Sequence, residues 1–212
     1  MVMKNLKNVL AILFVSVIMC GCSNSDKGGA SGSASNSGEG SASVVGTWKF
    51  DMDLGKKRVE AQKNNLKQEI LEGSEAEWVF NEDGTGTEKA VVITEATVED
   101  GVKYKTTING LNTFKWHKDG SRLVIKITNI DKMTWDTEAI CDNPRERAQW
   151  QNSAKEMSKE MTEVFRSAQG KEKIIADCNS NGSYDFEILE LNDNRLEVKS
   201  AKGDMKDFDR VK

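Results

Sequence analysis

The sequence contains a single histidine and a single proline, and each scarcity excludes something. His117 has no second histidine with which to share a metal ion, and no Cys/His pair, nucleophile elbow or phosphate loop accompanies it. Asp177 to Gly182 matches only the first half of a calcium loop, so we interpret it as a turn. We therefore expect no enzyme, no metal and no cofactor. Pro144 falls at the start of a predicted helix, so no predicted strand is interrupted by proline.

The chain also lacks an excess of basic residues. It has 34 acidic and 30 basic side chains, which gives a formal net charge of −4, and the two signs are interspersed. A nucleic-acid-binding domain typically carries a basic patch or stripe. We therefore expect no nucleic-acid partner.

The first 43 residues are not typical of a folded domain. Lys4 and Lys7 precede an apolar run from Val9 to Met19, which is too short for a permanent membrane span. This pattern indicates a secretory signal. Residues 23–43 consist mostly of serine, glycine, alanine and asparagine, a composition that predicts a flexible tether.

The end of the apolar run carries a processing motif. The segment Met19-Cys20-Gly21-Cys22-Ser23 resembles the lipobox of bacterial lipoproteins, with Cys22 as the lipidated residue and Cys20 as the alternative. The resemblance implies a signal peptide over 1–21, a lipidated tether over 22–43 and a domain over 44–212. It also implies a membrane anchor of several acyl chains, palmitate among them. Ser23 resembles the sorting pattern for the outer membrane of Gram-negative cells.

Cys141 and Cys178 are the cysteines that follow the tether. In an oxidising envelope compartment such a pair favours a disulfide, which here would join the two ends of a helical segment. The alternative is two buried thiols.

Large rings recur two positions apart in four segments. In a strand, residues at this spacing point to one face, so each segment offers two rings to a common side. The pairs are Trp48/Phe50, Trp78/Phe80, Phe114/Trp116 and Tyr184/Phe186. The pattern predicts an antiparallel sheet closed around an aromatic core.

Turn signals separate the predicted strands. Asp83-Gly84, Asp100-Gly101, Asn109-Gly110 and Asp119-Gly120 each favour a hairpin. Together they predict an up-and-down meander. Its strands include Ala90–Thr94, Val102–Ile108, Leu111–His117, Arg122–Thr128 and Met133–Ala139, and after a helix Lys173–Cys178, Tyr184–Leu191, Arg195–Lys199 and Met205–Val211.

Helical periodicity appears twice. One apolar face predicts a helix over about 54–72, with Gly73 placed to end it. Asn143-Pro144-Arg145-Glu146 is a helix start, and a regular apolar stripe predicts a helix over about 144–169 that ends at Gly170.

Two stretches resemble a known family. Gly46-Thr47-Trp48-Lys49-Phe50 and Trp78-Val79-Phe80-Asn81-Glu82-Asp83-Gly84-Thr85-Gly86-Thr87 look like the lipocalin-like domains of secreted bacterial proteins, and Tyr184–Leu191 with Arg195–Val198 is similar to their closing hairpin. The resemblance implies a mainly β fold: an antiparallel, up-and-down, lipocalin-like (calycin-type) β-barrel, here with two helical insertions. It also implies that Trp48 closes one end under a cationic side chain, Arg210.

Two functions are compatible with this pattern. Six rings could line a site for a small apolar or amphipathic ligand. The alternative for these rings is that they simply fill the interior, as side chains usually do in small barrels. The six rings are Trp48, Phe50, Trp78, Phe80, Phe114 and Trp116. The alternative is a scaffold lipoprotein that docks an envelope protein through the helical stripe of Trp150, Met157, Met161 and Phe165.

Overall fold

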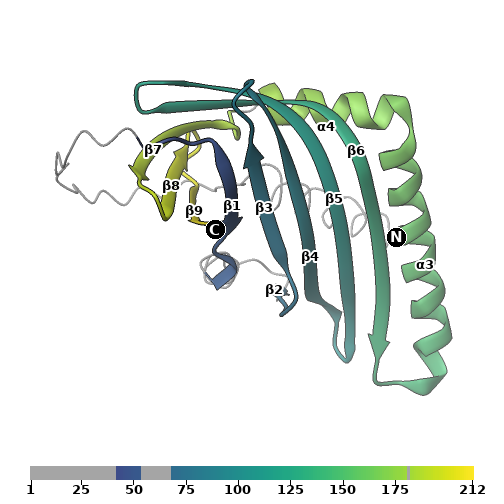
Figure 1. Cartoon of the computed structure of the whole chain (residues 1–212). Coiled ribbons are helices and arrows are strands. Elements are labelled where there is room, and N and C mark those ends of the chain that lie inside the picture. The colour runs from purple at the N-terminus through teal and green to yellow at the C-terminus, as the bar shows by residue number, and fades with distance from the viewer. Residues whose placement is uncertain (1–41, 54–67, 181) are drawn as a thin grey trace.

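The computed structural model describes residues 42–53, 68–180 and 182–212. Within these residues nine antiparallel strands belong to one sheet, accompanied by helices α3 and α4 (Figure 1). The strands are β1 Gly46–Phe50, β2 Gln68–Ile70, β3 Glu75–Phe80, β4 Thr85–Glu99, β5 Val102–Asp119, β6 Arg122–Cys141, β7 Asp185–Leu191, β8 Arg195–Ser200 and β9 Met205–Arg210. The helices are α3 Pro144–Arg166 and α4 Ala168–Ser180. The prediction of a mainly β fold is confirmed.

The strand pairings form a ring. Each strand from β3 to β9 pairs with the next, β9 pairs with β1, and β1 pairs back with β3. Strand β2 lies outside this ring, on the part of β4 that extends beyond β3. The ring has two narrow seams, because β6 and β7, and likewise β1 and β9, pair over only three residues of each strand.

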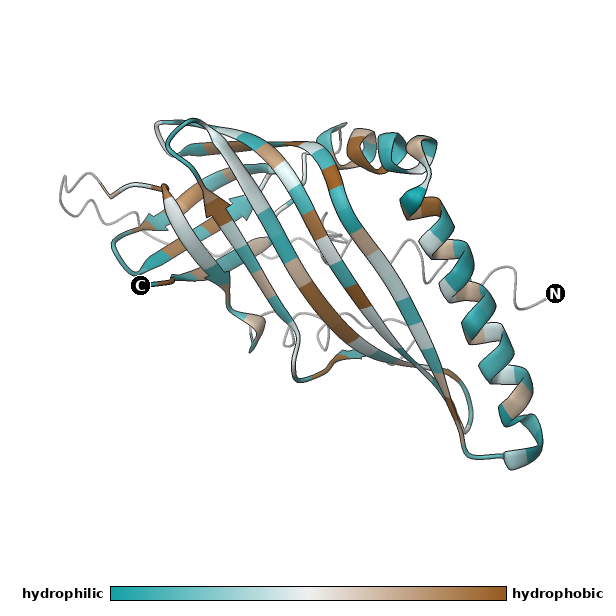
Figure 2. Ribbon diagram, turned by 45° about the vertical axis from the view of Figure 1, so that its right-hand side comes forward, coloured by the Kyte–Doolittle hydropathy of each residue, from teal (hydrophilic) through white to brown (hydrophobic). Residues whose placement is uncertain are grey.

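Strands β4, β5 and β6 are much longer than the others and extend beyond the ring (Figure 1). Along β4 buried and less buried residues alternate almost without interruption, as expected for a sheet with one face turned to a core. Figure 2 shows the same alternation of hydrophobic and hydrophilic residues along the long strands.

The predicted hairpin at Asn109-Gly110 is wrong. Strand β5 continues through both residues, which pair with Val91 and Ala90 of β4 on one side and with Thr134 and Met133 of β6 on the other. The turn propensity of Asn-Gly is therefore overridden by strand pairing on both edges. The predicted turns at Asp83-Gly84, Asp100-Gly101 and Asp119-Gly120 are confirmed, and all three glycines have positive φ.

A second predicted break, between Thr128 and Met133, is a pair of bulges inside β6. The side chain of Asp131 accepts hydrogen bonds from Asn129 Nδ2 at 2.6 Å and from Thr113 Oγ1 at 2.5 Å. These polar side chains thus stabilise an irregularity in a continuous strand.

The helix predicted over about 54–72 can be judged only at its end, because residues 54–67 lie outside the described part. Gln68–Ile70 forms strand β2, paired with Thr94–Ala96 of β4, so this end of the prediction is wrong. Local periodicity does not reveal that these residues lie beside the edge of β4. Pairing with that edge determines that Gln68–Ile70 is a strand.

The second helix starts as predicted and ends earlier. Asn143 Oδ1 accepts a hydrogen bond from Arg145 N, while Asn143 Nδ2 donates to Glu146 at 2.8 Å. The helix ends at Arg166, since Ser167 is extended and its hydroxyl caps the start of α4 by accepting from Gly170 N.

Gly170 does not end a helix. A Cβ atom there would lie 2.0 Å from Val164 O, so glycine is required by the close approach of α4 to the last turn of α3. The predicted strand Lys173–Cys178 is also wrong, because these residues belong to α4. The proposed turn over Asp177–Gly182 likewise begins inside this helix.

The two helices cover an edge of the sheet. Beyond Val124, strand β6 no longer pairs with β7, and α3 runs back along it while α4 crosses its upper end (Figure 1). Polar side chains from the helices bind backbone groups of β6. These bonds join Asn179 to Ile127 N and O, Lys171 to Ile130 O, Thr162 to Trp135 O and Ser158 to Thr137 N. The helices thereby protect an edge that could otherwise pair with another chain.

Candidate functional site

The six rings proposed as a ligand site lie together in the core. Trp48, Trp78, Phe80 and Phe114 are buried, and Phe50 and Trp116 are partly buried against them. Ring centroids lie 5.3 Å apart for Phe80 and Phe114 and 5.4 Å apart for Phe80 and Trp116. Such distances are those of packed aromatic side chains. The six rings therefore contribute first to the stability of the core.

The predicted contact between Arg210 and Trp48 is confirmed. The guanidinium carbon lies 4.9 Å from the centroid of the Trp48 ring, a cation–π distance. Arg210 also donates hydrogen bonds to Val45 O and, at 3.3 Å, to Ser43 O, while Trp48 Nε1 donates to Val44 O at 2.7 Å. Together these contacts close the ring at β1 and hold the segment that precedes it.

A polar group that the sequence analysis did not single out lies in the middle of this core. Glu88 on β4 is only 3% exposed and faces Trp78 on β3 and Asn112 on β5. Its carboxylate accepts hydrogen bonds from Trp78 Nε1 at 3.0 Å, from Asn112 Nδ2 at 3.0 Å and from Tyr184 Oη at 2.8 Å. Three donors from separate segments thus converge on one buried carboxylate, which compensates for much of the cost of removing it from water.

A buried cation lies close to the same cluster. Lys206 on β9 is 9% exposed, and its Nζ lies 5.1, 5.6 and 5.7 Å from the ring centroids of Trp78, Tyr184 and Phe186. The interior is narrow at this level, since the rings of Phe186 and Trp78 are 5.5 Å apart although three strands separate β7 from β3 along the sheet. We call the set of Trp78, Glu88, Asn112, Tyr184 and Lys206 the polar layer. The formal charges of Glu88 and Lys206 in this layer sum to zero.

One acceptor in the polar layer is not satisfied. Asn112 is 1% exposed, and its Oδ1 has no hydrogen-bond partner in the part of the chain that the structure describes. Polar atoms as deeply buried as this normally have a partner. Asn112 differs in this respect from Glu88, because both carboxylate oxygens of Glu88 accept hydrogen bonds.

The inner face of the long strands adjoins the polar layer. The next row beyond Glu88 and Asn112 consists of Ala90, Gly110 and Met133, and small residues occupy two of its three positions. The row after it is apolar and contains Val92, Ile108 and Trp135. A convergent polar group beside an apolar face with small side chains is the kind of surface on which amphipathic ligands bind.

The sequence did contain a signal for the polar layer. In β4 Glu88 stands between Gly86 and Ala90 at alternate positions, so strand periodicity places it on the buried face. Lys206 likewise stands two positions before the buried Phe208. A charged residue on the apolar face of a strand is therefore the sequence signal for the polar layer. The two-residue spacing of the rings identifies only the packed aromatic side chains beside it.

The cysteine predictions have two outcomes. Cys22 and Cys20 lie outside the described residues. Cys141 and Cys178 are both buried, but no disulfide joins them, so the predicted bridge is wrong. Asn179, next to Cys178, binds Ile127 near the start of β6, whereas Cys141 is the last residue of that strand. The length of strand between these points is on the order of 40 Å, and a disulfide needs Cα atoms within about 7 Å.

The stripe proposed as a docking face on α3 packs within the chain. Met157 and Phe165 are buried, and Trp150 and Met161 are partly buried against the core. Phe165 lies 6.2 Å from Trp135, and Trp150 lies 6.0 Å from Tyr104, measured between ring centroids. A partner that used this stripe would have to displace the sheet.

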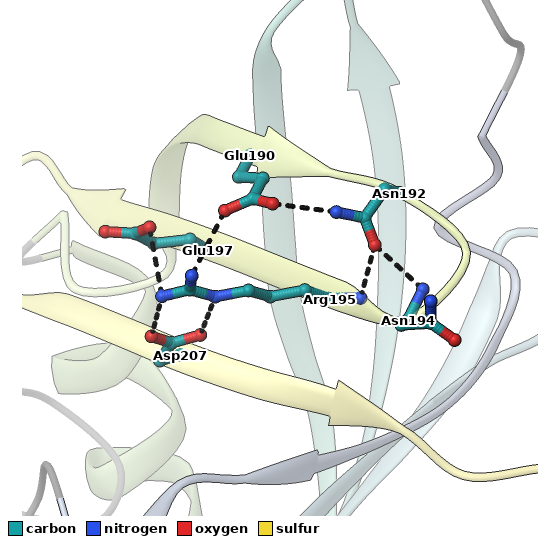
Figure 3. A network of polar contacts seen from close by, with 6 residues as sticks. All are labelled: Glu190, Asn192, Asn194, Arg195, Glu197 and Asp207. Atoms are coloured by element: carbon teal, nitrogen blue, oxygen red, sulfur yellow. Dashed lines mark hydrogen bonds and ion pairs between the residues drawn. The ribbon is translucent and has the colours of Figure 1, made fainter.

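Figure 3 shows a charged network on β7, β8 and β9. Arg195 and Glu197 alternate along β8 with the buried Leu196 and Val198, so the network lies on the face of β8 that is turned away from the core. Arg195 forms a bidentate pair with Asp207 on β9 and ion pairs with Glu190 on β7 at 3.3 Å and with Glu197 at 3.5 Å. The hydrogen bonds with Asp207 raise the pKa of the Arg195 guanidinium further above its already high range. Because one guanidinium joins carboxylates of β7, β8 and β9, we assign the network a structural role in aligning these three strands.

A cavity of about 590 Å³ lies beside the seam between β6 and β7. Arg122 and the turn from Ser200 to Gly203 contribute to its lining. Arg122 forms two hydrogen bonds with Asp185, at 2.8 and 2.5 Å, which raise the pKa of the guanidinium and lower that of the carboxyl. Two of the charged side chains in the lining are thus engaged with each other.

No group of three or more histidine, cysteine, aspartate or glutamate side chains among the described residues could hold a metal ion. Nor does any helix in the described ranges have the length and apolarity that crossing a membrane requires.

No protein-family model matches the chain, and a search of curated proteins gives no match.

Proposed function

We propose that this protein is an envelope lipoprotein whose strand ring is a lipocalin-like β-barrel that binds a small apolar or amphipathic ligand. The observation that carries the proposal is the polar layer, in which side chains from β3, β4, β5, β9 and the residue before β7 converge inside an apolar ring. Binding sites for small molecules combine a mostly apolar lining with a few convergent polar groups. The adjoining row of Ala90, Gly110 and Met133 would receive the apolar part of the ligand.

Native mass spectrometry of the full chain, extracted from the membrane of its own host, tests the ligand. We expect a retained small-molecule adduct. A matched pair of variants locates it: Gly110→Val adds a side chain to the inner face, whereas Asn109→Val changes the neighbouring residue on the other face of the same strand. Gly110→Val should abolish the adduct and Asn109→Val should retain it, with circular dichroism confirming that both variants fold.

The proposal fails if the extracted chain carries no adduct and no added amphiphile raises its melting temperature, because a ligand that binds the folded state must stabilise it. An adduct that persists in Gly110→Val would place the ligand elsewhere.

The proposed anchor has its own test. In this proposal Cys22 carries the acyl chains, in the outer membrane of a Gram-negative bacterium. Metabolic labelling with a palmitate analogue should be lost in Cys22→Ser and retained in Cys20→Ser. The opposite result would assign the anchor to Cys20, and labelling that survives in both variants would exclude a cysteine-linked lipid at this motif.

A further inference from the structure

The orientation of the Asn112 amide is determined by its neighbour. Asn112 Nδ2 donates to Glu88 Oε2 at 3.0 Å. The opposite orientation would place the amide oxygen against a carboxylate oxygen, two acceptors without a proton between them. The amide nitrogen therefore faces Glu88, and Oδ1 faces away from it.

The acceptors of Glu88 are already engaged. Oε1 accepts from Trp78, and Oε2 accepts from both Asn112 and Tyr184. Asn112 Oδ1, by contrast, is buried without a donor from the described residues. A group that enters this part of the interior therefore meets an acceptor that needs a hydrogen-bond donor.

The charges of the polar layer give an anion no net attraction. Lys206 Nζ lies over the rings of Trp78 and Tyr184, whose N–H and O–H groups both donate to Glu88, so cation and carboxylate flank the same two side chains. Their formal charges cancel. A ligand carboxylate beside Asn112 would be a second negative group near Glu88 and would offer no proton to Oδ1.

We infer that Asn112 Oδ1 accepts a hydrogen bond from the polar end of the ligand, and that this end is a neutral or cationic donor, such as an amide or an ammonium group, and not a carboxylate. The inference rests on the proposed function, because it specifies the chemistry of the same site. It excludes fatty acids as preferred ligands and favours amphiphiles that end in a proton donor.

Three amphiphiles with the same alkyl chain provide the test: dodecanamide, dodecylamine and dodecanoate. Each is titrated against the full chain carrying Nile red, a neutral fluorescent probe of apolar sites, below the concentration at which the amphiphile forms micelles. We expect the amide and the amine to displace the probe at concentrations at least about tenfold lower than dodecanoate, since a site with an unpaired acceptor discriminates against ligands that cannot donate. This comparison uses the native sequence and does not depend on the folding of a variant.

A pair of variants then assigns the preference to Asn112. Asn112→Leu should abolish the difference between amide and carboxylate, while Asn109→Leu, on the other face of β5, should leave it intact. If dodecanoate binds the native chain as well as the amide, the inference is wrong and the proposed ligand site stands. If neither the probe nor any of the three amphiphiles binds, and the chain extracted from its host carries no adduct, the proposed function itself is wrong.

Discussion

Thr94 and Thr106 are neighbours on one buried row of the sheet, yet their hydroxyl groups are in opposite situations. Thr106 Oγ1 shares a hydrogen bond of 3.2 Å with Thr137 Oγ1, which also accepts from Trp135 Nε1. Thr94 Oγ1 is buried and has no hydrogen-bond partner within the described ranges. We therefore expect the hydroxyl group of Thr106 to increase the free energy of unfolding and that of Thr94 to decrease it.

We expect Thr94→Val to stabilise the protein by about 1 kcal/mol, because valine has nearly the same shape and removes a hydroxyl whose burial is not compensated. Thr106→Val should destabilise it by a similar amount, since it removes one side of an existing hydrogen bond. Urea denaturation of both variants measures the two free energies of unfolding. Equal effects would mean that the Thr94 hydroxyl has a partner in solution.

At the same scale, the candidate site was only partly predictable from the sequence. The two-residue spacing of the rings correctly placed Trp48, Trp78, Phe80 and Phe114 in one core. It did not identify Glu88 or Lys206, because periodicity predicts that a residue faces inward but not which side chain will meet it there. The contact of Tyr184 with Glu88 joins residues 96 positions apart, which no local pattern contains.

Among the elements, strand β6 depends on the helices for part of its backbone hydrogen bonding. Asn179 of α4 binds both polar backbone groups of Ile127, each at 2.9 Å, and so replaces a neighbouring strand at that position. Since these groups lie at a part-buried site, loss of the side chain leaves them without protein partners.

Asn179→Ala should therefore reduce the free energy of unfolding by about 2 kcal/mol and accelerate hydrogen exchange at the Ile127 amide. Asn152→Ala provides the control, because Asn152 lies on the exposed face of α3. Chemical denaturation and amide exchange followed by NMR measure the two effects. Unchanged exchange at Ile127 would show that the helices do not protect the edge of β6.

The errors at the level of elements have a common cause. Asn109-Gly110 is a strong local turn signal, and Gly170 is a plausible helix end, yet the first lies between two strands and the second beneath a neighbouring helix. In both cases contacts with distant segments outweigh the local preference. The Asp-Gly turns were predicted correctly because each one joins two strands that pair with each other up to the turn, so the local preference and the strand pairing agree.

For the molecule as a whole, the short seam between β6 and β7 is one of the two narrowest parts of the ring. Three residue pairs form it, and Arg122 and Asp185 lie at its two ends. Hydrogen bonds from Arg122 lower the pKa of the Asp185 carboxyl, with the positive charge of Arg122 as a further contribution. A carboxyl whose pKa is lower in the folded state stabilises that state above its unfolded pKa, and this stabilisation is lost as the pH falls through the folded pKa.

Asp185→Asn should accordingly be less stable than the native chain at neutral pH, and the difference should diminish as the pH falls below about 3.8 and vanish in stronger acid. The effect should be small, because the pair is largely exposed to solvent. Thermal unfolding across this pH range measures it, with Asp193→Asn as a control for the loss of an exposed negative charge. A difference that is independent of pH would mean that the charge of Asp185 does not hold the seam.

The pairing of β1 with β9 also determines when the ring can form. Trp48 pairs with Arg210 near the other end of the chain, and Lys206, which completes the polar layer, lies on the same last strand. A growing chain that has not yet produced β9 therefore exposes unpaired edges on both β1 and β8 and leaves Glu88 without the nearby cation. Contacts between such distant segments slow folding and prolong the exposure of unpaired strand edges, which are prone to aggregation. Synthesis must therefore pass through β9 before the ring can close around its interior.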